Sequence, residues 1–253
     1  MDEAKIISVD VDNVEKESFF CYKSKLKTPG YQKKLTWLKA RFEEGLRIKI
    51  LYHGKRSFGF IEYLPGEYAW RAVHAPGYMF IHCIWVVGKG KGRGFGSQLL
   101  EECIHDARSD GMYGVAMVTS SRVWLVDKPL LLKNGFVEVA QAPPSFDLVV
   151  LMFDQNAPDP TFPTDWEDRA TRCGEGLTVL RSDQCPYIED ATLAVVNAGA
   201  EAGVETRVVT LQSAHEIRDT APSAYGLFNI VYNGELYSYY LKKGIVKFLN
   251  EQK

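Results

Sequence analysis

Apolar and polar residues alternate along much of residues 1–153, and this pattern predicts a sheet with helices packed on it. Four short apolar runs are predicted strands, at residues 5–9, 78–87, 113–120 and 146–153. Two segments repeat apolar residues at helical spacing, at residues 31–44 and 97–110. Alternation on both sides of His53-Gly54 predicts a hairpin, and a further strand follows the turn at Asn134-Gly135. The run at 78–87 is apolar throughout, as expected of a strand buried on both faces.

The pattern changes after Asp154. Residues 156–172 contain prolines and acidic residues without periodicity, which predicts a linker on the surface. A smaller unit follows, in the order strand, helix, strand, short helix, hairpin and helix, with the hairpin turning at Asn233-Gly234. We therefore expect a first domain over residues 1–155, a linker over 156–172 and a second domain over 173–253.

Composition limits the classes of partner. A net charge of −2 over 253 residues gives no reason to expect nucleic acid or an anionic membrane, so any cationic site must be local. No apolar run is long enough to span a bilayer, and the acidic start lacks a secretory leader. The five cysteines are scattered without a CxxC pair or nearby histidine spacing, so we expect a reduced cytoplasmic protein without a metal.

The stretch "GKGKGRGFG" at residues 88–96 links an apolar strand to a helix. Glycines there expose backbone N–H groups at the positive end of the helix, and Lys89, Lys91 and Arg93 add cations at the rim. The segment lacks the G-K-[ST] ending of a Walker loop and the later acid of a dinucleotide fingerprint. It predicts a site for a phosphate-bearing ligand, with a solvated basic loop as the alternative.

This stretch resembles the signature of the GCN5-related N-acetyltransferases (GNAT), an apolar strand followed by [Q/R]-x-x-G-x-[G/A]. Lys91 stands in the first position of that pattern, and Gly88 replaces a usual proline. "LLKNGFVEV" is similar to the family's closing motif, so the resemblance extends over residues 1–153. It implies an α/β fold with a mixed central sheet, and acetyl-CoA as cosubstrate. The residues that it implies for CoA binding are Trp85, Val86, Val87, Lys91, Gly92, Arg93, Gly94, Phe95, Gly96 and Ser97.

In such a transferase, main-chain groups of Trp85, Val86 and Val87 would pair with the pantetheine arm, and the glycine loop would hold the pyrophosphate. Glu62 and His82 lie on the strands that flank the cleft, so they are the candidate bases, separately or together through water. A salt-bridged carboxylate and a core histidine are the structural alternatives. Strand neighbours face opposite ways, which argues against a nucleophilic pair of His82 with Cys83.

The family's tyrosine, which often protonates the leaving thiolate, falls at Leu131. Tyr113 or Ser120 would have to replace it, unless the thiolate leaves unaided. The aromatic segment at residues 62–70 is either a packed turn or an acceptor-binding loop in which Glu67 and Trp70 contact the substrate, with Ser120 as a further contact. The expected reaction is direct attack of a small amine on acetyl-CoA, and the rival is a CoA-binding scaffold that has lost its chemistry.

The second unit resembles the thioredoxin fold. Cys185 stands before its first long helix, whose N-terminus favours a thiolate, and Pro222 stands at the cis-proline position. Ile188 replaces the second cysteine of a C-x-x-C motif, and Cys173 could act as the partner only if the linker folds back. The unit is therefore a single-thiol module centred on Cys185, or a structural or dimerising domain. The pairing of the two domains resembles bacterial acetyltransferases with a YoaP-like C-terminal domain.

Overall fold

The computed structural model describes residues 4–123, 125–126, 128–241 and 244–252. The chain forms two compact units. The first comprises Met1–Leu26, Leu35–Ala69 and Val73–Phe162, and the second comprises Lys27–Lys34, Trp70–Ala72 and Pro163–Lys253. Two short N-terminal segments thus belong with the C-terminal unit, which local periodicity does not reveal.

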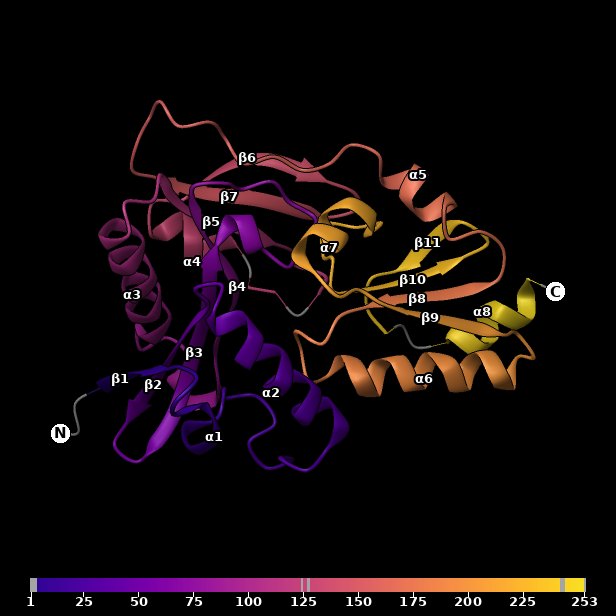
Figure 1. Cartoon of the computed structure of the whole chain (residues 1–253), viewed down its shortest axis with the longest axis horizontal. Coiled ribbons are helices and arrows are strands. Elements are labelled where there is room, and N and C mark those ends of the chain that lie inside the picture. Colours follow the sequence, from indigo (N-terminus) through magenta and orange to yellow (C-terminus); the bar gives the residue numbers. More distant parts are fainter. Residues whose placement is uncertain (1–3, 124, 127, 242–243, 253) are drawn as a thin grey trace. The chain divides into compact units, whose positions relative to one another are not determined.

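The first unit is built on a seven-stranded sheet in the order β1-β2-β3-β4-β5-β7-β6 (Figure 1). Its strands are β1 (Ala4–Val9), β2 (Arg47–His53), β3 (Arg56–Pro65), β4 (Tyr78–Val86), β5 (Gly114–Thr119), β6 (Val137–Ala142) and β7 (Phe146–Met152). Only β4 and β5 run parallel, and the other neighbours are antiparallel. The sheet is therefore mixed, as the GNAT resemblance implied.

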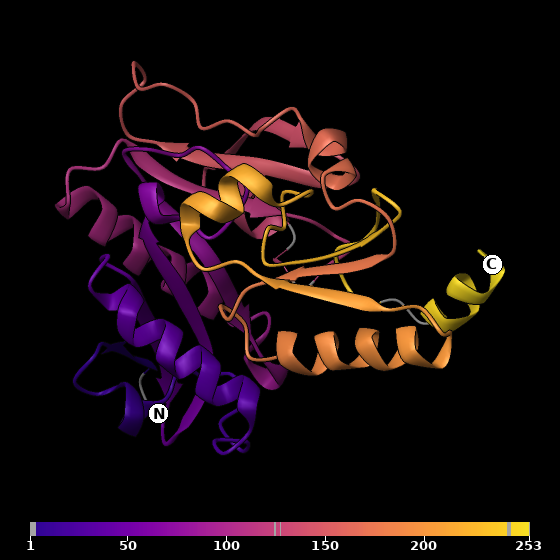
Figure 2. The same ribbon diagram turned by 45° about the vertical axis from the view of Figure 1, so that its right-hand side comes forward.

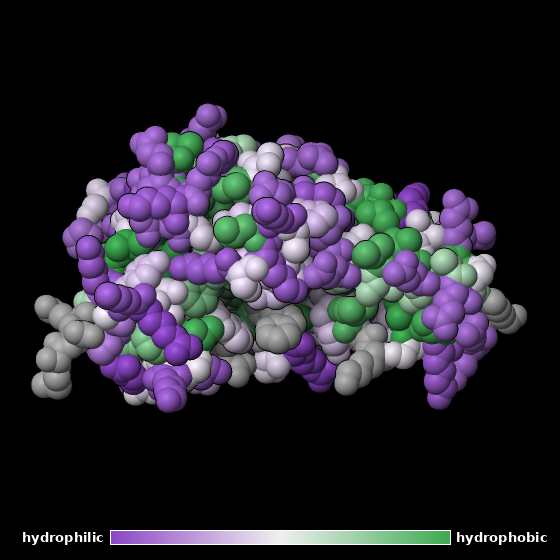
Figure 3. Space-filling view, turned by 90° about the horizontal axis from the view of Figure 1, so that it is seen from below, coloured by the Kyte–Doolittle hydropathy of each residue, from purple (hydrophilic) through white to green (hydrophobic). Residues whose placement is uncertain are grey.

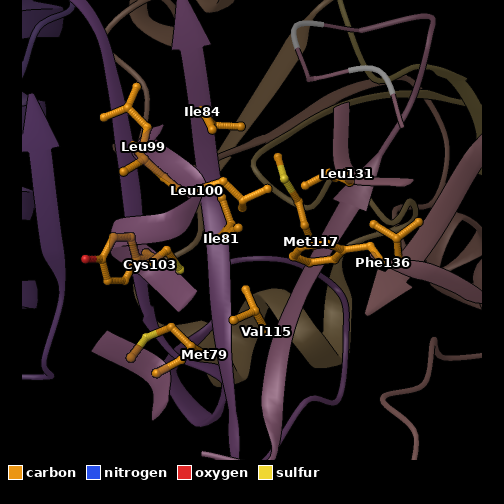
Figure 4. Packing of buried hydrophobic residues seen from close by; sticks show 14 of the residues in the cluster. Met79, Ile81, Ile84, Leu99, Leu100, Cys103, Val115, Met117, Leu131 and Phe136 are labelled. Atoms are coloured by element: carbon orange, nitrogen blue, oxygen red, sulfur yellow. The ribbon is translucent and has the colours of Figure 1, made fainter. Parts of the chain in front are cut away.

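Helices of the first unit pack on this sheet. They are α1 (Val14–Glu17), α2 (Pro29–Phe42), α3 (Phe95–Ser109) and α4 (Lys128–Lys133), with single 3-10 turns at Gly66–Tyr68 and Gly88–Gly90. The part of α2 up to Lys34 is grouped with the second unit. The apolar stripe of α3, which includes Leu99, Leu100 and Cys103, is fully buried against alternate residues of β4 and β5 (Figure 4). Burial of one such leucine contributes roughly 1.5–3 kcal/mol to folding.

Charged groups fix α3 against β2 as well. Asp106 accepts a hydrogen bond from the Tyr63 hydroxyl at 2.6 Å and lies 3.3 Å from both Arg47 and Lys49. Arg47 also contacts Asp110 at 2.7 Å. Burial would raise the pKa of Asp106, but the Tyr63 hydrogen bond and the Lys49 ammonium outweigh it and lower that pKa. These contacts hold the helix that carries the glycine loop.

The second unit contains a four-stranded sheet in the order β11-β10-β8-β9. Its strands are β8 (Leu177–Arg181), β9 (Thr206–Thr210), β10 (Phe228–Tyr232) and β11 (Glu235–Ser238), and its helices are α5 (Trp166–Thr171), α6 (Ile188–Glu201), α7 (Ala214–Thr220) and α8 (Ile245–Glu251). β8 and β9 are parallel and α6 connects them, lying alongside both in Figure 2. β10 is antiparallel to β8 and β11. The order of elements agrees with the one expected from sequence.

The segment expected as a linker has more structure than its composition suggested. Thr161 exchanges two backbone hydrogen bonds with His74, at 2.8 and 2.9 Å, within the first unit. α5 occupies Trp166–Thr171, and its Arg169 is buried and donates to two carbonyls of the second unit. A helix of six residues is too short to show a helical period in the sequence.

The described part of the chain contains no helix long and apolar enough to cross a membrane. Figure 3 shows one face on which hydrophilic side chains are mixed with hydrophobic patches.

Candidate functional site

The central feature of the first unit is the point where β4 and β5 separate. Their parallel ladder runs only from Tyr78 opposite Gly114 to Ile81 opposite Met117. Beyond it, residues 83–86 of β4 pair with β3 alone, and the end of β5 pairs with β7. The separation leaves a gap inside the sheet, directly below the glycine loop.

An open cleft of about 520 Å³ lies at this gap. It is lined by the end of β4, the loop and first turn of α3, the segment after β5, and α4. The predicted site residues that line it are Trp85, Val86, Lys91, Gly92, Gly94, Phe95, Gly96, Ser97 and Ser120. Val87 and Arg93 do not line it, whereas Lys133 and Ser121 do. Lys133 ends α4 and lies within the segment that resembles the family's closing motif. Its positive charge beside that motif's glycine is the sequence feature that could have indicated it.

Backbone direction changes the expected set for the pantetheine arm. The Val87 N–H donates to the Phe58 carbonyl of β3 at 2.8 Å. Successive residues of a strand direct their N–H groups to opposite sides, so Trp85 also faces β3, while Ile84 and Val86 face the gap. The main chain of Trp85 and Val87 is therefore already paired with β3, and that of Ile84 and Val86 is directed to the gap. Sequence shows the strand but not which side each N–H faces.

The N-terminus of α3 is open. Gly94 is its N-cap with a left-handed φ of 79°, and a Cβ on Gly94 would have no heavy atom within 4 Å. Glycine is thus required by the backbone rather than by lack of room. The first turn contains no acidic residue. Its N–H groups, from Phe95 to Ser97, have no acceptor within the helix because they precede the first full turn.

Two of the loop's cations take different positions. The Lys91 ammonium lies 5.5 Å from the centre of the Trp85 ring, at the cleft. The Arg93 guanidinium contacts His53 Nε2 at 3.1 Å and lies 4.7 Å from the Phe95 ring. Lys91 therefore contributes its charge directly to the cleft, whereas Arg93 is held against the β2–β3 turn.

Glu62 and His82 lie together on the opposite face of the sheet from α3. His82 Nδ1 is 3.3 Å from Glu62 Oε1, and both residues are buried, at 0% and 3% exposure. The imidazole also contacts the rings of Trp37 and Phe80. His82 directly follows Ile81, the last residue of β4 that pairs with β5, so the pair lies where the gap begins.

A β-bulge creates this arrangement. The register of β3 with β4 passes from Glu62 opposite Cys83 to Tyr63 opposite Ile81, which leaves His82 as the extra residue. Ile81 and Ile84 both pack in the core below α3. His82 and Cys83 therefore lie on the same face, and the alternation that argued against their proximity does not hold here. A bulge of one residue has no signature in this sequence.

The other predicted residues are dispersed. Glu67 is exposed and accepts a hydrogen bond from the Gly77 N–H at 2.7 Å, while Trp70 is buried and belongs to the second unit. Tyr113 precedes β5, at the end of that strand remote from the cleft. Ser120 lies in the cleft, with its Oγ 3.3 Å from the Ser145 Oγ.

Leu131, which stands where the family's closing motif has a tyrosine, is fully buried and packs in the core cluster (Figure 4). Within the residues that the structure describes, no three His, Cys, Asp or Glu side chains gather as ligands for a metal ion.

In the second unit, Cys185 is half-buried in the turn before α6, and its carbonyl accepts from the Ile188 N–H at 3.1 Å. Cys173 lies at the other end of β8, where burial raises the pKa of its thiol. Five strand residues separate the two ends, about 16 Å, so these thiols do not pair. The peptide bond before Pro222 is trans, contrary to the cis-proline expectation.

The chain is similar to several known proteins. The model of the acetyltransferase (GNAT) family matches residues 11–123. The uncharacterized N-acetyltransferase YoaP of Bacillus subtilis (strain 168) is 31% identical over 234 residues, which is 90% of each protein.

Among solved structures, yncA of Salmonella typhimurium, with its cofactor acetyl-CoA, is 19% identical and has a TM-score of 0.44 over 62% of this chain and 98% of its own. A GNAT family acetyltransferase of Brucella melitensis in complex with acetyl-CoA is 16% identical, with a TM-score of 0.40 over 65% and 98%.

Proposed function

The chain belongs to the GNAT acetyltransferase family, and we propose that it transfers the acetyl group of acetyl-CoA to a small amine bound on the α2 side of the sheet. The observation that carries this proposal is the gap between β4 and β5, which opens onto the acid-free N-terminus of α3. The gap suits an extended pantetheine arm, and the N-terminus of α3 suits a phosphate group.

Residues of the cleft fit CoA in two ways. The main chain of Ile84 and Val86 offers hydrogen bonds to an extended pantetheine arm, as a neighbouring strand would. The N–H groups of the first turn of α3 suit the pyrophosphate, and Lys91 and Lys133 add positive charge from two sides of the cleft. When bound, the thioester supplies an activated acetyl group.

The Glu62–His82 pair is the proposed base. In this proposal Glu62 is ionised and only accepts hydrogen bonds, and His82 carries its ring proton on Nδ1, the nitrogen 3.3 Å from Glu62 Oε1. Nε2 is then the basic nitrogen, which removes the proton from the attacking amine, and Glu62 stabilises the imidazolium that forms. Direct attack follows, and the acetyl group passes from sulfur to nitrogen in one transfer.

The leaving thiolate needs less help. A thiol has a pKa of about 8.5, so its anion departs readily close to neutral pH. The hydroxyl of Ser120 is the proposed proton donor because it lines the cleft, whereas Leu131 has no proton to give. The absence of the tyrosine is the observation that favours the rival reading, a CoA-binding scaffold without turnover.

For the second unit we propose a thioredoxin-like fold in a structural role. The sheet order, the parallel β8–β9 pair and the α6 crossover support that fold. The separation of Cys173 from Cys185 and the trans bond before Pro222 argue against a dithiol cycle. A single reactive thiol at Cys185 is the alternative, and homodimerisation through this unit is a role that fits a structural domain.

Two measurements test the transferase. Calorimetric titration with acetyl-CoA is expected to give a dissociation constant below about 1 mM. Release of free CoA thiol across a panel of primary amines then distinguishes an enzyme from a scaffold. Glu101→Gln, at an exposed position of α3, is the control variant for both measurements. No binding at that concentration would contradict the CoA site, and binding without thiol release for any amine would favour the scaffold.

A further inference from the structure

The segment between α1 and α2, residues 18–26, has an unusual backbone. Ser18, Phe20 and Tyr22 have left-handed φ angles of 63°, 77° and 57°. Among the other non-glycine residues that the structure describes, only Asn233, at a hairpin turn, has such an angle. Bulky side chains rarely adopt this conformation, and it persists where the surroundings impose it, often at ligand sites.

Packing places this segment over the face that carries the Glu62–His82 pair. Phe20 stacks on Phe60 of β3 with ring centres 5.0 Å apart. Phe60 is two residues before Glu62, on the same face, and its partner on β4 is Trp85, which lines the cleft. The segment therefore borders the side of the sheet from which the amine would approach.

Lys23 is the charged residue that this backbone holds in place. Its ammonium donates to the Tyr52 hydroxyl at 3.2 Å and to the Ser57 hydroxyl at 3.3 Å. It also lies 5.3 Å from the Tyr52 ring and 5.8 Å from the Phe20 ring. Tyr52 and Ser57 accept these bonds, so each keeps its own hydroxyl hydrogen to donate. Three donors therefore converge at one point.

No carboxylate of the described residues lies within 4.0 Å of the Lys23 ammonium. Lys49, also on the sheet, contacts both Glu102 and Asp106. Residues 18–28 contain three lysines and no acid. A half-buried ammonium with neutral partners is stabilised by an arriving anion, because a charge-assisted hydrogen bond replaces lost hydration.

We propose that Lys23, with the hydroxyls of Tyr52 and Ser57, binds an anionic oxygen group of the acceptor. This inference rests on the proposed acetyl transfer and narrows its substrate to amines that also carry a carboxylate or a phosphate. Ser57 and Glu62 are five residues apart on β3, about 17 Å. The anionic group therefore lies well away from the amine, as in a short peptide with a free C-terminus or a long aminoalkyl phosphate.

Kinetics with matched probes tests this site. Pentaalanine is compared with pentaalanine amide, and 12-aminododecyl phosphate with 12-aminododecanol, by release of CoA thiol, because probes of this length can span about 17 Å. We expect kcat/KM to be about 10-fold or more higher for the anionic member of at least one pair. Lys23→Met removes that preference without changing KM for acetyl-CoA, and Lys23→Arg keeps part of it. Lys25→Met, on the same segment, retains the full preference.

Equal rates for both members of each pair would overturn the proposal. So would a Lys23→Met effect on both members alike, or a raised KM for acetyl-CoA, which would assign Lys23 to the cosubstrate.

A second measurement does not require turnover. Acylation of individual lysines by an N-hydroxysuccinimide ester is followed by mass spectrometry, with acetyl-CoA binding measured separately by calorimetry. Pentaalanine or 12-aminododecyl phosphate is expected to slow modification of Lys23 saturably, and not that of Lys25, while the neutral probes have no effect. Absence of protection by both anionic probes overturns the Lys23 site even where acetyl-CoA binds. Protection without acetyl-CoA binding leaves the anion site and refutes the transferase.

Discussion

Two strand–turn–helix junctions in this molecule have the same topology and opposite chemistry. β4 leads into α3 through a glycine loop, and β8 leads into α6 through the turn that holds Cys185. The first turn of α3 contains no acid, whereas that of α6 contains Glu189 and Asp190. Glu189 is in turn bound by Lys33 and Arg181. Neither helix has a side-chain cap, but acidic residues of the protein face the positive end of α6, whereas none stands in the first turn of α3.

The comparison shows that a helix N-terminus after a strand does not define an anion site by itself. The composition of the first turn decides, because acids of the protein compete with the ligand for the same N–H groups and dipole. Here that difference is readable in sequence, as "GFGSQ" against "YIEDA".

Transferring the acid of α6 to α3 is expected to have the largest effect. Gly96→Glu places a carboxylate in the first turn of α3, and we expect acetyl-CoA affinity to fall by about 100-fold or more through repulsion of the phosphates. Isothermal calorimetry measures this. A Cβ on Gly96 would contact only the flexible Leu130 side chain, at 3.2 Å, so Gly96→Ala is the steric control. Equal losses in both variants would show that space, not charge, matters at this junction.

Variants of the Glu62–His82 pair test whether catalysis can be lost while acetyl-CoA still binds at the β4–α3 junction. We expect Glu62→Gln and His82→Ala each to lower kcat by about 100-fold or more, because the amine loses its base, while acetyl-CoA affinity stays within twofold. Thiol release at saturating substrates gives kcat, and calorimetry gives affinity. Cys83→Ser is the matched variant on the same face. A loss there as large as in His82→Ala would assign the chemistry to the thiol as well.

The anchoring of α3 is expected to have a moderate effect. Asp106→Asn should lower the free energy of unfolding by about 1–3 kcal/mol at pH 7, because the Tyr63, Lys49 and Arg47 contacts lose a charge. The pKa of Asp106 is lowered in the folded state, so its contribution is present at neutral pH and is lost as pH falls through that depressed pKa. Urea unfolding of both proteins at pH 7 and near pH 3 measures this. A difference that does not shrink in acid would refute the ionic origin.

A substitution at the β8–α6 junction is expected to have the smallest effect. Cys185→Ser should leave acetyl-CoA affinity and turnover within twofold, because Cys185 belongs to the other unit and lines no part of the cleft. Iodoacetamide should modify Cys185 faster than Cys173, whose thiol is buried and has a raised pKa. Peptide mass spectrometry over time resolves the two. Loss of turnover in Cys185→Ser would instead support the alternative in which Cys185 is a reactive thiol needed for function.

Much of this architecture is predictable from local pattern. The strands, α3 and α6 follow from periodicity, and the glycine loop follows from the requirement for left-handed backbone at Gly94. Contacts that depend on register are different. The bulge at His82 decides which side chains share a face, and the direction of the Val86 N–H decides what faces the gap. Neither depends on residue type, so neither is visible without the partner strand.

Side chains of the segment before α2 illustrate the same limit. "SFFCYKSKLKT" has no periodicity, and its left-handed residues are not the glycines or asparagines that signal such angles. Residues 27–34 and 70–72 belong with the C-terminal unit through contacts far away in sequence. Sequence therefore predicts best those features that depend on the residues of one helix, strand or loop alone.

The separation of β4 and β5 has a consequence for the lifetime of the protein. It leaves unpaired main-chain groups in the middle of a sheet, where a bound extended molecule would act as a temporary strand. A ligand at 100 times its dissociation constant adds about 2.7 kcal/mol to the free energy of unfolding. We therefore expect acetyl-CoA to slow amide hydrogen exchange at Ile84 and Val86 and to retard proteolysis. The cell's supply of activated acetate would then regulate how long this protein persists, as well as how fast it works.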